Sequence, residues 1–208
     1  MERRRQAGYG IPAICLHWLI AGLVLALIGI GFAMRRTEID PVLQFSLYQW
    51  HKSVGLCVLV LAALRETLWL FAPHPQPVAG LGPIERQASW TTHVLLALLC
   101  LLVPLSGWAV VSTSTLGMPT LLFDVLIVPA LPLPRSAAGE AFWSLVHAAA
   151  AYLLAALAAL HAAAALYHHY IRRDAVLLRM LGRMPATDPR TGGHGGGTGD
   201  GTGGRMRR

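Results

Sequence analysis

The sequence predicts an all-α membrane protein, a bundle of four transmembrane helices, and two observations carry this prediction. The chain of 208 residues is 55 % hydrophobic and only 13 % charged, whereas an average soluble domain is about 25 % charged. The apolar residues gather in four stretches of the length, about 20 residues, that a helix needs to cross a bilayer. A disordered chain, a coiled coil and a typical soluble domain are excluded by this composition. The stretches are residues 11–34, 51–71, 90–111 and 143–168.

Each stretch is expected to form one helix. The first, 11–34, is too long for the apolar region of a cleavable signal peptide and lacks a good cleavage motif, so we expect it to remain. A further apolar segment, 121–133, is too short to span and is interrupted by Pro129 and Pro132 and followed by Pro134, so we interpret it as an interfacial part of a long third loop. Tryptophans favour the membrane interface. All six lie near the predicted span ends: Trp18, Trp50, Trp69, Trp90, Trp108 and Trp143.

The basic residues predict the orientation of the chain. Of the 17 Lys and Arg residues, thirteen fall on the side that holds both termini and four on the other side. Cytoplasmic loops carry the excess of positive charge, so both termini are predicted to be cytoplasmic. We therefore interpret the net charge of +7 as a signal that orients the chain in the membrane. Membrane lipid is the predicted partner, and nucleic acid is not predicted as one.

The chain divides into two parts by composition. Residues 1–181 carry all four apolar stretches, whereas residues 182–208 contain ten glycines and several arginines. Such a tail has almost nothing to bury, so we expect 182–208 to be disordered in the cytoplasm.

Histidines are the strongest functional signal, because polar groups inside a membrane are costly and usually face the bundle interior. His147 and His161 lie 14 residues apart on the fourth span, which places them on nearly one helix face about 21 Å apart in depth. His51 matches the depth of His147, and His17 matches that of His161. Two depth-matched pairs on facing helices predict two haems, each with two histidine ligands to its iron.

Other uses of these histidines are possible in principle. Structural hydrogen bonding is one, and zinc is another, although zinc usually takes four converging ligands. Small residues beside the ligands would admit a flat macrocycle, or would simply permit close helix packing. These residues are Gly55, Ala148, Ala150, Ala151, Ala158 and Ala162.

Longer motifs give a family resemblance. The first span contains "ICLHWLI", the second begins "HKSVG", and the fourth ends "LHAAAALYHHYIRRDAVLLRM". Over residues 9–181 the chain resembles the prokaryotic cytochrome b561 family, and within it a quinone-linked superoxide oxidase. The resemblance implies a bacterial inner-membrane protein with two haems b that exchanges electrons with ubiquinone. It implies the same ligands as the depth argument, with His17 and His161 on the cytoplasmic-side haem and His51 and His147 on the periplasmic-side haem.

The two ends of such an electron path need partners. His93, His168 and His169 lie on the cytoplasmic side and can exchange hydrogen bonds and protons, so we expect them to form the ubiquinone site, His169 contributing least. At the periplasmic end we expect superoxide as the electron donor. This expectation rests on the family resemblance more than on the positive charge of the periplasmic loops. The alternatives are a cytochrome b membrane-anchor subunit of a larger dehydrogenase or hydrogenase complex and, third, a metal or proton transporter. The sequence names no protein partner.

Overall fold

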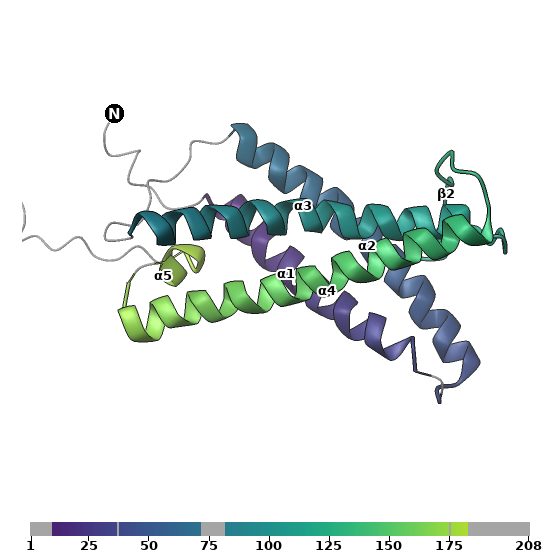
Figure 1. Ribbon diagram of the computed structural model, residues 1–208, viewed down its shortest axis with the longest axis horizontal. Helices are drawn as coiled ribbons and strands as arrows, with labels where there is room; N and C mark the ends of the chain where they lie inside the picture. The colour runs from purple at the N-terminus through teal and green to yellow at the C-terminus, as the bar shows by residue number, and fades with distance from the viewer. Residues whose placement is uncertain (1–9, 37, 72–81, 175, 183–208) are drawn as a thin grey trace, which may run out of the picture.

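Four long helices form the body of the computed structural model, which describes residues 10–36, 38–71, 82–174 and 176–182 (Figure 1). All four are long and apolar enough to cross a membrane, which confirms the predicted number of spans. The helices are α1 (Ile11–Ala33), α2 (Pro41–Phe71), α3 (Pro83–Thr113) and α4 (Ala137–Tyr167). The predicted disorder of the tail falls on residues 183–208, outside the described part of the chain.

Three of the helices begin earlier than the apolar stretches predicted. The second begins at Pro41 because the Asp40 carboxylate accepts hydrogen bonds from the Val42 and Leu43 amides, each at 3.0 Å. The fourth begins at Ala137 because the Ser136 hydroxyl accepts a hydrogen bond from the Gly139 amide at 3.0 Å. A helix of 31 residues is about 46 Å long and exceeds the hydrocarbon core of about 30 Å. Its polar turns therefore continue beyond the bilayer core, where hydropathy gives no signal.

The helices pack in a definite order. α4 lies antiparallel along α3, and α2 packs against both α1 and α3, whereas within the described residues α4 makes few backbone contacts with α1 or α2. The core therefore joins all four helices through side chains. Its buried members are Ile20, Val24, Val58, Ala62, Leu99, Cys100, Ala150 and Leu154.

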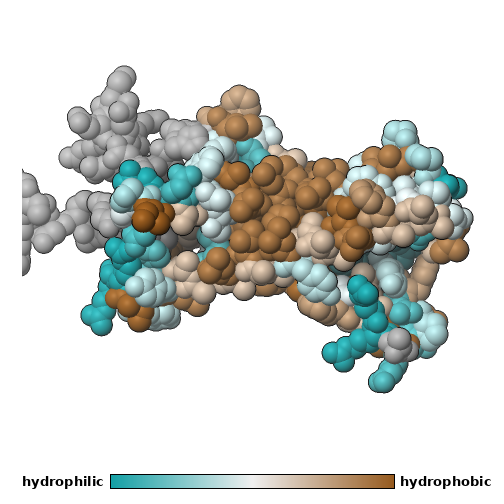
Figure 2. Space-filling model, viewed as in Figure 1, coloured by the Kyte–Doolittle hydropathy of each residue, from teal (hydrophilic) through white to brown (hydrophobic). Residues whose placement is uncertain are grey.

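The outer surface is apolar around the middle of the bundle. Leu25, Val60 and Leu160 are each at least 60 % exposed. Figure 2 shows the hydrophobic residues as a broad band across the middle of the visible face, with hydrophilic residues at both ends. Soluble proteins rarely expose apolar patches of this extent, so the band is the surface that contacts lipid.

The two ends of the bundle differ. At one end, called here the terminal end, α1 begins and α4 passes into a π-helix, η2 (His168–Arg172), and the short α5 (Val176–Met180). At the other, the hairpin end, β1 (Thr120–Leu122) pairs antiparallel with β2 (Leu126–Val128). Figure 1 shows α5 and β2 at opposite ends.

The hairpin was not predicted. Residues 121–133 were expected as an interfacial loop, but part of this segment forms the two strands. Ser53, which is only 1 % exposed, holds the hairpin against α2. Its hydroxyl donates to the Leu121 carbonyl at 3.2 Å and accepts from the Phe123 amide at 2.9 Å. The all-α prediction therefore holds for the bundle and misses this small sheet.

Candidate functional site

Four histidines form two pairs across the bundle. His17 on α1 faces His161 on α4 with ring centroids 6.3 Å apart, and His51 on α2 faces His147 on α4 at 6.1 Å. His51 and His147 each lie ten residues after the start of their helices, so both lie about 15 Å from the hairpin end. The structure thus brings together the pairs that sequence depth predicted, one toward each end.

The spacing of both pairs suits a metal between the rings. A metal–imidazole nitrogen bond is about 2 Å long. Two such bonds, with about 1 Å from each ring nitrogen to its centroid, place the rings about 6 Å apart, as in both pairs. Within the described ranges no group of three or more His, Cys, Asp and Glu side chains is placed to hold a metal ion. The pairs therefore have the donor set of a six-coordinate haem, whose macrocycle supplies four nitrogens, and lack that of a zinc site.

Hydrogen bonds orient His147. Its Nδ1 lies 2.8 Å from the Val103 carbonyl oxygen and 3.3 Å from the Ser106 hydroxyl. Because a carbonyl only accepts, Nδ1 carries the hydrogen and Nε2 keeps its lone pair, which is the arrangement of a metal-binding histidine. Across the bundle, the Nδ1 atom of His51 is buried and has no hydrogen-bond partner among the described residues.

Glycines make room for these two rings. A Cβ at Gly107 would lie 3.1 Å from Cε1 of His147, and a Cβ at Gly31 would lie 3.5 Å from Cε1 of His51. Both rings line a cavity of about 160 Å³ to which all four helices contribute. The small residues Gly55, Ala148 and Ala151, expected beside the ligands, are part of its wall. Mostly apolar and lined by two imidazoles, this site suits a haem.

The terminal end holds a third histidine beside the first pair. The His93 ring centroid lies 5.0 Å from that of His161. Its Nδ1 lies 2.6 Å from the Ser89 carbonyl oxygen and therefore carries the hydrogen. The Arg65 guanidinium, from α2, acts electrostatically on both His17 and His161. Spacing accounts for this position, because Arg65 lies 14 residues after His51 on α2, the same separation that places His161 one level away from His147 on α4.

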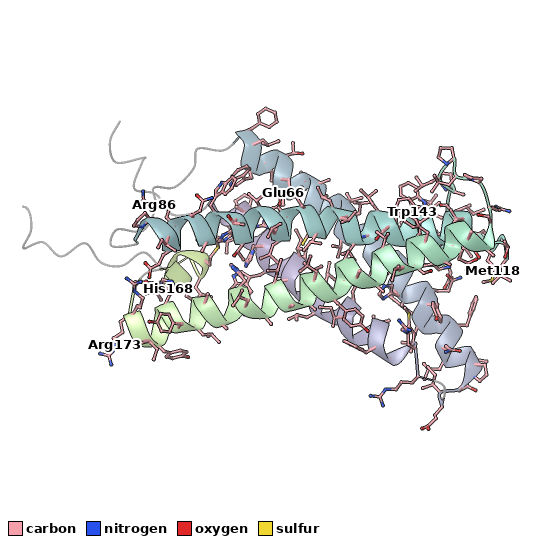
Figure 3. The ribbon with its side chains drawn as sticks, viewed as in Figure 1. Glu66, Arg86, Met118, Trp143, His168 and Arg173 are labelled. Atoms are coloured by element: carbon pink, nitrogen blue, oxygen red, sulfur yellow. The ribbon has the colours of Figure 1, made fainter. Side chains whose placement is uncertain are left out.

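The remaining predicted quinone residues lie where α4 ends. His168 Nδ1 lies 2.5 Å from the Asp174 carboxylate, and His169 contacts the ring of Tyr170. Figure 3 shows His168 at the terminal end beside α5, with Arg173 pointing away from the bundle. His93, by contrast, contacts His161. Within the described contacts, His93, His168 and His169 therefore each have a different partner and do not form one cluster. Asp174 was missed by the sequence analysis, although its place in the "HHYIRRD" motif is a signal that could have found it.

Comparison with known proteins decides the family. A family model described as prokaryotic cytochrome b561 matches residues 8–183. The chain belongs to the prokaryotic cytochrome b561 family. It is therefore a multi-pass membrane cytochrome that transfers electrons, and the family implies haem b as its cofactor.

Individual relatives match over nearly their whole length. "Cytochrome b561 homolog 2" of Escherichia coli (strain K12) is 30 % identical over 175 residues, which is 84 % of this chain and 92 % of the relative. "Cytochrome b562" of Cereibacter sphaeroides is 32 % identical over 85 % of this chain and 97 % of the relative. A Yersinia pestis protein named "Probable superoxide oxidase CybB" is 31 % identical over 83 % of this chain and 95 % of the relative.

Proposed function

We propose that this cytochrome b561 carries electrons across the bacterial inner membrane through two haems b. His17 and His161 would hold the iron of one haem, and His51 and His147 would hold that of the other. The observation that carries the proposal is the geometry of the pairs, with ring centroids 6.3 and 6.1 Å apart toward opposite ends of one bundle. When bound, each haem supplies an iron that accepts and releases one electron.

The protein's own residues position and insulate the path. The Val103 carbonyl fixes the His147 ring and keeps Nε2 available, while the glycines opposite the rings let the helices approach without displacing them. The walls of the cavity at His51 and His147 are mostly apolar and make few hydrogen bonds available to water. At the terminal end, the positive charge of Arg65 near His17 and His161 favours the reduced form of a nearby haem, because added electrons are stabilised by a cation.

The donor we propose is superoxide, which loses one electron and becomes O2. Two observations support this: a relative is named as a superoxide oxidase, and Arg35 lines the cavity that holds His51 and His147. A cation at the mouth of a site attracts an anionic donor and raises its rate of encounter. We therefore propose that the hairpin end faces the periplasm, with both termini in the cytoplasm as the basic residues predict.

The acceptor we propose is ubiquinone at the terminal end. His93 and His168 are the candidate partners of its carbonyl oxygens, with His169 as a lesser contributor, because imidazole both donates hydrogen bonds and exchanges protons near neutral pH. Two electrons from two superoxide ions and two protons from the cytoplasm convert one quinone to quinol. Residues 1–181 carry this whole path, and residues 182–208 take no part in it.

Stopped-flow reduction of the purified protein by superoxide, with and without a soluble ubiquinone, tests the proposal. Haem absorbance should rise in milliseconds to seconds and decay when quinone is present, and superoxide dismutase should abolish both phases. Haems that take no electrons from superoxide, in a protein that copurifies with a second subunit, would instead support the membrane-anchor alternative. Absence of any haem spectrum would leave only the transporter alternative.

A further inference from the structure

The contact between His168 and Asp174 has a geometry that the electron path does not require. Their closest atoms, Nδ1 and Oδ2, are 2.5 Å apart, and the side chains are only 19 % and 20 % exposed. The contact closes across the π-helix η2, whose last turn is ended by Arg173 in the left-handed conformation with φ of 53°. The Asp174 amide also donates to the His168 carbonyl at 3.1 Å. Short π-helices are rare and occur frequently at functional sites.

Asp174 decides which nitrogen of His168 faces a ligand. An ionised carboxylate only accepts, so Nδ1 carries a hydrogen and the exchangeable position is Nε2. When the ring is protonated, Nε2 carries a hydrogen that it can donate. A carboxylate that holds an imidazole in one tautomer and stabilises its cation is a recurring device for proton transfer.

The direction of His168 suits this role. α4 remains α-helical up to Tyr167. His168 follows His161 by seven residues, so it projects within about 20° of the direction of His161 and lies about 10 Å closer to the terminal end. Because Asp174 holds Nδ1, Nε2 is the nitrogen left for a ligand that lies beyond His161 toward this end. After η2 the chain returns to His168, so that the Asp174 carboxylate contacts Nδ1 and its amide donates to the His168 carbonyl.

We propose that His168 and Asp174 form a proton-transfer pair for quinone reduction, His168 as the donor and Asp174 as its positioning residue. This rests on the proposed quinone site. Reduction of the quinone to quinol takes two electrons and two protons. One proton passes from Nε2 of the His168 imidazolium to the nearer quinone oxygen, which leaves neutral His168 beside ionised Asp174. The other oxygen takes its proton from water, and water at the membrane surface then reprotonates His168.

Two further contacts hold this segment in place and supply a control. Arg172 of η2 forms an ion pair with Glu85 at the start of α3, and the Trp18 indole donates to the Met180 carbonyl at 2.8 Å. Both contacts tie the segment after α4 to the rest of the bundle without involving the His168 ring. Glu85→Gln therefore weakens the attachment and leaves the pair unchanged.

The test measures reoxidation of dithionite-reduced holoprotein by a short-chain ubiquinone over a range of quinone concentrations. His168→Gln retains a hydrogen-bond donor for the quinone, and Asp174→Asn retains the shape of the carboxylate, but neither supports the protonated ring. Both variants should keep two haems and a half-saturating quinone concentration near that of the wild type, while the maximal rate falls about tenfold or more. Asp174→Glu should restore part of the rate, and Glu85→Gln should leave it nearly unchanged.

Three results would overturn the proposal. An unchanged maximal rate in Asp174→Asn, with a slow His168→Gln, would remove Asp174 from the mechanism and leave the quinone site standing. Equal losses in Asp174→Asn and Glu85→Gln would show that the pair only holds the segment. Unchanged rates and unchanged half-saturation in both His168→Gln and His168→Ala would remove His168 from the quinone site, and with it the proposed pair.

Discussion

Replacing Gly107 tests how closely His147 is packed against α3. A Cβ at this position would lie 3.1 Å from Cε1 and 3.2 Å from Nδ1 of His147, closer than the 3.4 Å at which ordinary contacts begin. Alanine therefore moves the ring by about 0.3 Å, the difference between 3.4 and 3.1 Å. The 2.8 Å hydrogen bond to Val103 survives such a shift, because bonds up to about 3.2 Å are normal. Valine adds two methyl groups in the same space, and the ring must leave its position.

The cost of that displacement follows from what the ring loses. The hydrogen bond to the Val103 carbonyl is worth about 1 kcal/mol, and loss of a bond that orients a metal ligand typically weakens metal binding about 10–100-fold. Gly107→Val should therefore lose the haem at the hairpin end readily, and Gly107→Ala should retain it with a dissociation rate raised severalfold at most. The haem at the His17–His161 pair should stay.

The assay is the haem-to-protein ratio together with the rate of haem transfer to apomyoglobin. Gly29→Val is the matched control, because it makes the same change in α1 at an exposed position where a Cβ meets nothing within 4 Å. The reasoning is refuted if Gly107→Val keeps both haems with wild-type transfer rates, or if Gly29→Val loses haem to the same degree.

Three further predictions concern the ligands, the tail and the quinone. His147→Ala should remove the haem at the hairpin end and largely spare the other, and His161→Ala should do the reverse, as difference spectra and haem content would show. Truncation after Gly182 should leave haem content and quinone reduction unchanged, because the Gly-rich tail cannot bury enough apolar surface to support the bundle; a large loss of haem would contradict this. His168→Ala should weaken quinone binding severalfold by loss of one hydrogen bond of about 1 kcal/mol, with both haem spectra intact and a smaller effect from His169→Ala. If both His168→Ala and His93→Ala reoxidise normally with quinone, the quinone site lies elsewhere.

Hydropathy and helical spacing predicted the parts of the fold that depend on local sequence. The four apolar stretches became four helices, and the spacing of His147 and His161 placed them correctly against His51 and His17. A bilayer makes these features readable, since each spanning segment must satisfy its own backbone hydrogen bonds and be apolar over a fixed length.

Features that depend on contacts between distant segments could not be predicted in this way. Ser53 holds the hairpin through two hydrogen bonds to residues about 70 positions away, and Gly107 meets a ring on another helix. Asp40 is a residue type that commonly caps helices, so the start of α2 at Pro41 could have been predicted from it. Hydropathy, however, detects only the apolar part of the helix. Asp174 was overlooked for a different reason. Side chains six residues apart on a continuous α-helix point in different directions. Asp174 reaches His168 because the helix ends in the π turn η2.

Haem stoichiometry tests the central claim most directly. Pyridine haemochrome absorbance, divided by protein measured through quantitative amino-acid analysis, gives the number of haems b per chain in purified wild-type protein. Two histidine pairs at matched spacing predict a ratio of two, which falls to one in His147→Ala and in His161→Ala. A ratio of one in the fully loaded wild-type protein would contradict the account.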